Sequence, residues 1–96
     1  MKNPEIPRNI IGPGLRRIRN EKGFTQPKLV EQLQLKGWDI SRETLAKIES
    51  QLRWISDFEL HFLATALDVP MATFFPQQKG KEKVLEFITR LERTLD

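Results

Sequence analysis

Apolar residues recur at helical spacing along most of the chain, and no alternating segment is long enough to predict a strand. Leu15 and Ile18 form the first apolar stripe, in a helix predicted over about 14–22. Gly23 follows this helix and is expected to end it, because glycine readily adopts the left-handed conformation found after helix C-termini. The pattern therefore predicts an all-α protein.

The second and third predicted helices follow closely. Thr25 is a good N-cap for a helix whose apolar stripe precedes a stop at Gly37. Ser41 caps the next helix, over 42–49, which turns Leu45 and Ile48 inward. The apolar stripe of the earlier of these two helices consists of Leu29, Val30 and Leu33.

A fourth helix is signalled by Ser56 and Glu59, the spacing of a capping box. Val69-Pro70 ends that helix, and a short fifth helix over 71–75 is expected to close the core. The apolar residues of the fourth helix are Leu60, Leu63, Ala64 and Leu67.

The chain divides into an arm, a domain and an additional helix. We expect an N-terminal arm over 1–13, a compact five-helix domain over 14–76, a hinge over 76–80 and an amphipathic helix over 81–95. The arm carries Ile6, Ile10 and Ile11.

The last predicted helix has an apolar seam with the spacing of a coiled coil. Two heptads are too short for a stable isolated coiled coil, so the helix either folds back on the domain or pairs with a second copy. We favour the second alternative, a homodimer, in which the apolar arm could share the interface. The seam consists of Val84, Ile88, Leu91 and Leu95.

Composition excludes several classes of protein. The chain has no cysteine, no apolar run of membrane-spanning length, and an N-terminus interrupted by Pro4, Pro7 and Pro13, which predicts no signal peptide. Residues 1–53 carry eleven Lys or Arg and six Asp or Glu, whereas residues 54–96 carry five and seven. This distribution favours a nucleic-acid partner for the first half and is consistent with a cytoplasmic protein.

Two short helices joined by a turn, the second capped and rich in polar residues, form an arrangement that enters the DNA major groove. The groove is about 12 Å wide and admits one α-helix. With Leu45 and Ile48 inward, the residues Arg42, Glu43, Ala46 and Lys47 face outward. Arginine and lysine suit guanine and glutamate accepts from cytosine N4, while the hydroxyls of Ser41 and Thr44 suit phosphate.

The segments GFTQPKLVEQLQ, ISRETLAKIE and LHFLATALDVPMATFF resemble the Xre-type, Cro and phage-repressor helix-turn-helix family over Leu15 to Phe75. The resemblance implies a Cro/repressor-like fold and a prokaryotic or phage regulator of transcription that binds double-stranded DNA. It implies that the helix 42–49 reads bases, that Gln26 and Arg53 contact phosphate, and that Arg19 and Glu49 form a structural ion pair. Relatives commonly bind palindromic sites as dimers.

Two features depart from the family. Val30 stands where relatives most often have alanine, and a bulkier side chain is expected to separate or tilt the two helices. Between Leu33 and Ile40 the chain has six residues, QLKGWD, where relatives have about one. We expect most of them to extend the second helix by a turn, with Trp38 filling the resulting gap.

Plainer interpretations exist for several residues. The outward residues of 42–49 could be a solvated helix face, in which Glu43 and Lys47 form an i,i+4 pair. Trp54 could lie against the DNA backbone or pack over the turn. The single His61 has no ligand-spaced partners, so neither a metal nor a cofactor is predicted.

Two functions remain open at this stage. The first is a sequence-specific regulator, most simply a repressor, without a small-molecule ligand. The second is an antitoxin or another interaction module that uses the same fold to bind a partner protein. An enzyme is not expected, because the chain has no nucleophile-base pair and no glycine loop that would bind phosphate.

Overall fold

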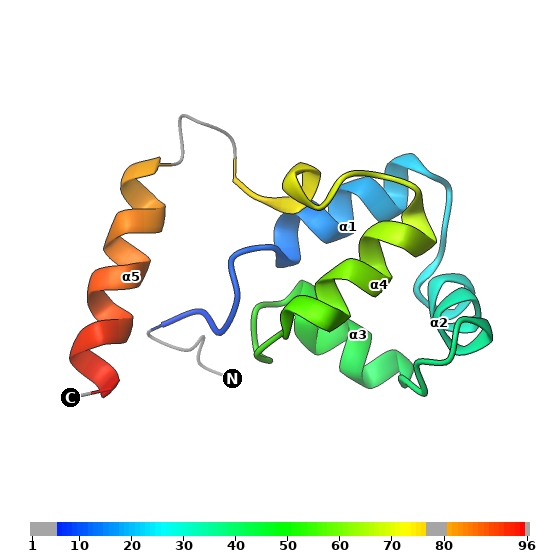
Figure 1. Cartoon of the computed structure of the whole chain (residues 1–96), viewed down its shortest axis with the longest axis horizontal. Coiled ribbons are helices and arrows are strands. Elements are labelled where there is room, and N and C mark those ends of the chain that lie inside the picture. Colours follow the sequence, from blue (N-terminus) through cyan, green and yellow to red (C-terminus); the bar gives the residue numbers. More distant parts are fainter. Residues whose placement is uncertain (1–5, 77–80, 96) are drawn as a thin grey trace.

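The computed structural model describes residues 6–76 and 81–95, and within 81–95 the side chains of 85, 86 and 88–93. The described residues are all helical apart from turns and connecting segments, in the order α1 (Gly12–Glu21), α2 (Gln26–Leu35), α3 (Arg42–Glu49), α4 (Asp57–Leu67), the 3₁₀ helix η1 (Met71–Phe74) and α5 (Lys81–Leu95). The predicted fold class, a five-helix domain with an additional C-terminal helix, is confirmed (Figure 1).

The N-caps predicted for α2, α3 and α4, and the glycine stops after α1 and α2, occur where the sequence placed their signals. The hydroxyl of Thr25 accepts from the Lys28 amide, and that of Ser41 accepts from the Thr44 amide. Ser56 and Glu59 form both bonds of the capping box. Gly23 and Gly37 have φ angles of 80° and 103°, the left-handed region that ends helices at glycine.

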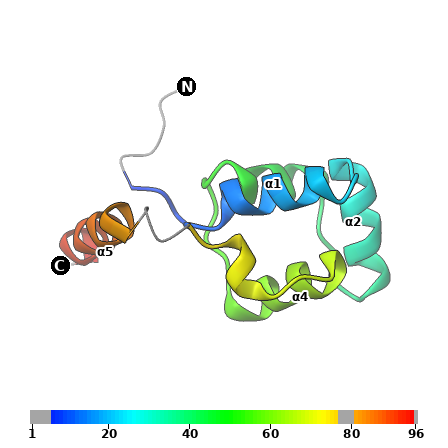
Figure 2. The same ribbon diagram turned by 90° about the horizontal axis from the view of Figure 1, so that it is seen from above.

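One core holds α1 to α4 and η1 together. It is made of side chains that point inward from every one of these elements, and Figure 2 shows the elements packed around it. The largest fully buried side chains are Phe74, Ile11, Leu15, Leu29, Leu33, Leu45, Ile48, Leu63 and Leu67. Burying nonpolar side chains of this size is the main stabilising contribution in a domain of this length.

The start of α1 differs from the sequence prediction. The helix begins at Gly12 instead of about residue 14, and Asn9 and Ile11 are already buried. The second half of the predicted arm is therefore part of the folded domain, and Ile11 is not available to an interface.

The longer turn between α2 and α3 has the predicted construction. The helix α2 continues to Leu35, and the Gln34 side chain donates to the Ile40 carbonyl at 2.9 Å across the turn. The Trp38 ring is partly buried, with its centroid 6.2 Å from that of Phe62 on α4. Trp38 thus packs the extended turn against the core.

The helix α5 lies outside this bundle (Figure 1). Leu85 and Ile88 are exposed in it, whereas Leu91 is half-buried. The side chains of Val84 and Leu95, both assigned to the predicted seam, lie outside the described part. No helix in the described residues is long and apolar enough to cross a membrane.

Candidate nucleic-acid interface

The helix α3 presents one apolar and one charged face. Leu45 and Ile48 are fully buried, as the stripe predicts. Arg42, Glu43 and Lys47 are exposed, and Ala46 is partly buried between the two faces. The helix is therefore held by its inner face while its charged side chains remain accessible.

The charged side chains of α3 have no partner within the part of the chain that the structure describes. No hydrogen bond or ion pair involves the side chains of Arg42, Glu43 or Lys47 there, and the i,i+4 pair between Glu43 and Lys47 is not formed. Three unpaired charged groups at the start and middle of one exposed helix face leave their donors and acceptors free for an external ligand.

The N-terminus of α3 is tied by its cap. The Ser41 hydroxyl accepts from the Thr44 amide at 3.1 Å and donates to the Thr44 hydroxyl at 3.0 Å. Both hydroxyl groups lie beside the backbone amides at the N-terminus of α3, where the helix dipole favours an anion. The two side chains are thus positioned next to Arg42 at the N-terminal end of α3.

A buried ionic network anchors the other end of α3. Glu49, whose side chain is fully buried, accepts from Arg19 at 2.6 and 3.1 Å, from Arg16 at 3.4 Å and from Gln26 at 3.0 Å. Burial alone raises the pKa of Glu49, but the hydrogen bonds from Arg19, Gln26 and Arg16 outweigh it and lower the pKa below its ordinary value. The expected pair of Arg19 and Glu49 is present, and the structure adds two partners to it.

The Gln26 side chain, predicted to contact phosphate, is partly engaged inside the protein. Its amide nitrogen is engaged by Glu49, which ties the first residue of α2 to the last residue of α3. Because a glutamine amide has a second donor hydrogen and a carbonyl oxygen, the side chain keeps hydrogen-bonding capacity at the surface.

Arg53 also has internal partners. Its guanidinium donates to both carboxylate oxygens of Glu59 at 3.0 Å and to the Trp54 carbonyl at 3.0 Å. The Arg53 hydrogen bonds, with the Ser56 amide, lower the pKa of Glu59 against the opposing effect of its partial burial. The sequence identified Glu59 as a capping residue. Its second role, as the ion-pair partner of Arg53, depends on the loop that brings these two residues, six positions apart in the chain, together.

One residue that the sequence analysis did not single out is central to the site. Asn9 is buried, and its amide bonds to carbonyls at the end of α3 and in the following loop. An Asn just before a predicted helix is itself a signal for local capping, but its long-range partners could not be read from the chain. Trp54, in the same loop, is about half exposed.

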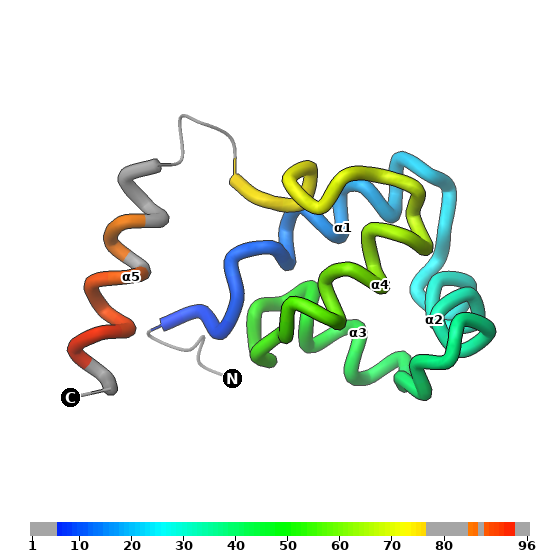
Figure 3. The backbone as a smooth tube through the Cα atoms, viewed as in Figure 1, coloured from blue at the N-terminus to red at the C-terminus, as the bar shows by residue number. Residues whose placement is uncertain are grey.

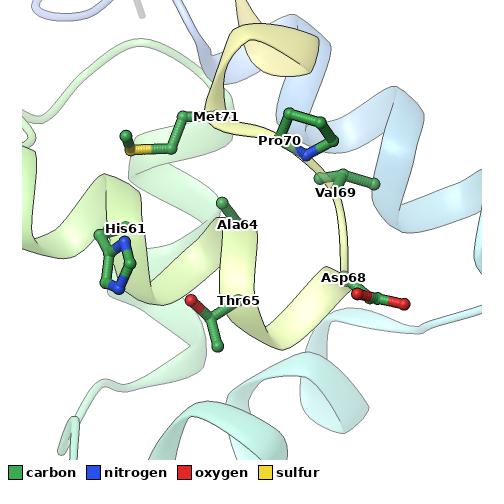
Figure 4. Close-up of a pocket in the computed structure, with 7 residues that line it drawn as sticks. All are labelled: His61, Ala64, Thr65, Asp68, Val69, Pro70 and Met71. Atoms are coloured by element: carbon green, nitrogen blue, oxygen red, sulfur yellow. The ribbon is translucent and has the colours of Figure 1, made fainter.

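A surface depression is lined by residues of α4 and of the segment that follows it. It has a volume of about 560 Å³ and is open, between the outer side of α4 and residues 68–71 (Figure 4). His61 and Asp68 lie at opposite ends of this group, and the described residues include no cluster of His, Cys, Asp and Glu suited to a metal ion. The described residues that line this depression therefore suggest no catalytic or metal-binding site.

Comparison with known proteins identifies the same segment. Residues 15–74 match a family model described as helix-turn-helix, of the Xre/Cro type. This match covers α1 to η1, including the turn and α3. No curated protein matches the chain.

Proposed function

The chain belongs to the Xre/Cro-type helix-turn-helix family, and from that premise we propose that it is a sequence-specific regulator of transcription, most simply a repressor, that reads the major groove of double-stranded DNA with α3. Membership of this family supports the assignment of the chain as a DNA-binding regulator. We also propose that the protein acts in the cytoplasm, associated with DNA, and that it catalyses no reaction.

The observation that carries the proposal is the unpaired outward face of α3. Arg42 suits bidentate bonds to guanine O6 and N7, Glu43 suits cytosine N4, and Lys47 suits guanine or a phosphate. Among the described residues neither the Glu43 nor the Lys47 side chain has a partner, so both side chains are free to contact DNA.

The proposed phosphate contacts surround this face. Ser41 and Thr44 stand at the start of α3, and Gln26 at the start of α2. Arg53 can reach a phosphate only with a donor not already bonded to Glu59 and Trp54, so we rank it behind the other three.

Selection of bound duplexes from a random pool tests the function. We expect wild type to enrich one consensus, and Arg42→Ala, Glu43→Ala and Lys47→Ala each to lose preference at one base position, by about 1–3 kcal/mol of discrimination. Arg17→Ala is the matched control, because it removes the same charge as Arg42→Ala from a residue of α1 that is bonded to Thr73 and Glu21. Wild type that enriches no sequence and binds no duplex at low salt would refute the proposal.

We further propose that the chain acts as a homodimer through α5. Leu85 and Ile88 are large apolar side chains exposed on α5, which supports an apolar partner surface. Val84, Ile88, Leu91 and Leu95 remain the proposed seam. A palindromic consensus in the selection experiment would support two-fold symmetry.

A protein partner is the second candidate, as in an antitoxin. Two exposed aromatic side chains, Trp54 and Phe58, favour it, because aromatic residues are enriched in protein interfaces. Coexpression with the product of an adjacent reading frame would test it. A stable heterocomplex in size-exclusion chromatography is the expected result, and elution of the two proteins separately would exclude that partner.

A further inference from the structure

The buried amide of Asn9 joins the segment before α1 to the end of α3. The side chain is only 5% exposed. Its Nδ2 donates to the carbonyl of Ile48 at 3.0 Å and to that of Arg53 at 2.9 Å. Its Oδ1 accepts from the amides of Ile11 at 3.1 Å and Gly12 at 2.8 Å. Both donors and both acceptor sites of the amide are therefore used.

The backbone on both sides of Asn9 is bonded to the loop that follows α3. The Arg8 amide donates to the Gln51 carbonyl at 2.9 Å, and the Gln51 side chain donates to the Asn9 carbonyl at 3.0 Å. Gln51 has a φ of 65°, a left-handed conformation that is uncommon for a residue with a side chain. We call Arg8, Asn9 and Gln51 the clasp; Figure 3 shows the chain path that it connects.

The start of α1 packs so closely against the end of α3 that the two helices cannot shift relative to each other next to Asn9. A Cβ on Gly12 would lie 2.5 Å from the carbonyl oxygen of Ile48 and 2.7 Å from that of Glu49. The first turn of α1 therefore contacts the last turn of α3 through backbone atoms, directly beside the amide of Asn9. Close packing and hydrogen bonds fix the same point.

We infer that Asn9 is a positioning residue for DNA binding, and this inference depends on the proposed function. Through the carbonyls of Ile48 and Arg53, its amide sets the C-terminal end of α3 and the loop 50–54 relative to α1. That loop lies next to the reading helix and carries Arg53 and the exposed Trp54. A loop released from the clasp would sample several conformations, and binding DNA would then require ordering it.

Two variants separate this role from helix capping. Asn9→Ser keeps an oxygen that can accept from the amides of Ile11 and Gly12, but its one hydroxyl hydrogen cannot replace both bonds to the carbonyls of Ile48 and Arg53. Asn9→Asp keeps the shape but replaces both donor hydrogens with an acceptor facing two carbonyls. Asn20→Ser is the matched control, because Asn20 is exposed near the other end of α1.

The experiment combines two measurements at a temperature where circular dichroism shows each variant fully folded. Amide hydrogen exchange of residues 50–54 is measured on the full chain without DNA. Affinity for the duplex selected by wild type is measured over a series of salt concentrations. A role confined to stability would change the melting temperature but neither the affinity nor the salt slope of the folded protein.

We expect exchange at 50–54 to rise in both Asn9 variants and to stay as in wild type in Asn20→Ser. The dissociation constant should rise roughly tenfold, the equivalent of one or two net hydrogen bonds. The slope of log affinity against log salt should fall by about one phosphate contact.

Each other outcome counts against the inference. Unchanged exchange shows that the amide does not hold the loop. Faster exchange with wild-type affinity and slope shows that the loop position does not matter for binding. If wild type itself binds no duplex, the proposed function fails and the DNA role of Asn9 fails with it, whereas variants that bind as well as a binding wild type refute this inference alone.

Discussion

At the scale of the residue, Glu49 joins three helices through its side chain. Its fully buried carboxylate accepts from Arg19, Arg16 and Gln26, so one side chain links α1, α2 and α3. Removing one partner of a buried ion pair costs about 3–5 kcal/mol, because the other charge stays buried without compensation. The position of α3 therefore depends on Glu49 being ionised.

This gives the domain a pH-dependent stability. The folded-state pKa of Glu49 lies below its ordinary value of 4.5, so the unfolded chain binds more protons in that range. The contribution is complete above pH 4.5 and is lost as the pH falls through the folded-state pKa. Urea denaturation from pH 7 downward should show a constant free energy of unfolding that declines below about pH 4.5.

The variant Glu49→Gln tests which residue is responsible. It should lower the free energy of unfolding at pH 7 by roughly 3 kcal/mol and flatten the decline at low pH. Some decline should persist, because the pKa of Glu59 is lowered as well. Glu21→Gln, in an exposed pair with Arg17, is the control and should change little. A decline identical in wild type and Glu49→Gln would contradict the prediction.

At the scale of the element, the contact between α1 and η1 depends on a missing side chain. A Cβ on Gly14 would lie 2.1 Å from the carbonyl oxygen of Phe74, which is backbone and cannot rotate away. Gly14→Ala should therefore force the two helices apart and lower the free energy of unfolding by about 1–3 kcal/mol, despite the better helix propensity of alanine.

Thermal denaturation of Gly14→Ala beside Asn20→Ala measures this contact. Asn20 is exposed on the same helix, so alanine there should be neutral or slightly stabilising. Equal melting temperatures for the two variants would show that α1 and η1 are not packed as closely as described.

A second element-scale prediction concerns α5. Ile88→Asp places a charge within the proposed apolar seam, so it should weaken self-association at least tenfold in sedimentation equilibrium. The adjacent Thr89→Asp, outside the seam, is the control. Since Ile88 has no place in the core of α1 to η1, the main unfolding transition should be unchanged. Wild type that is monomeric at every concentration would reject the dimer.

At the scale of the whole molecule, folding and association should be separable. Among the residues whose burial the structure describes, the core cluster lies between Ile11 and Phe74. A chain ending at Pro76 should therefore fold cooperatively, with a melting temperature close to that of the full chain, while losing the association that we assign to α5. Circular dichroism and sedimentation measure the two properties. Loss of cooperative unfolding on truncation would mean that α5 contributes to the core.

Much of this architecture is determined locally and could be read from the sequence. The caps at Thr25, Ser41 and Ser56 and the stops at Gly23 and Gly37 act within a few residues, and the apolar stripes follow the helical period. The charged face of α3 follows from the same period once Leu45 and Ile48 are assigned to the core.

Contacts between residues far apart in the chain depended on the tertiary structure. Asn9 finds its partners 39 and 44 residues away, and Gln26 meets Glu49 23 residues away. Such partners depend on how the helices pack, and local propensity carries no information about that arrangement. For the same reason the sequence placed Asn9 and Ile11 in a free arm and left Arg53 unpaired, whereas the packed domain buries the first two and bonds the third to Glu59.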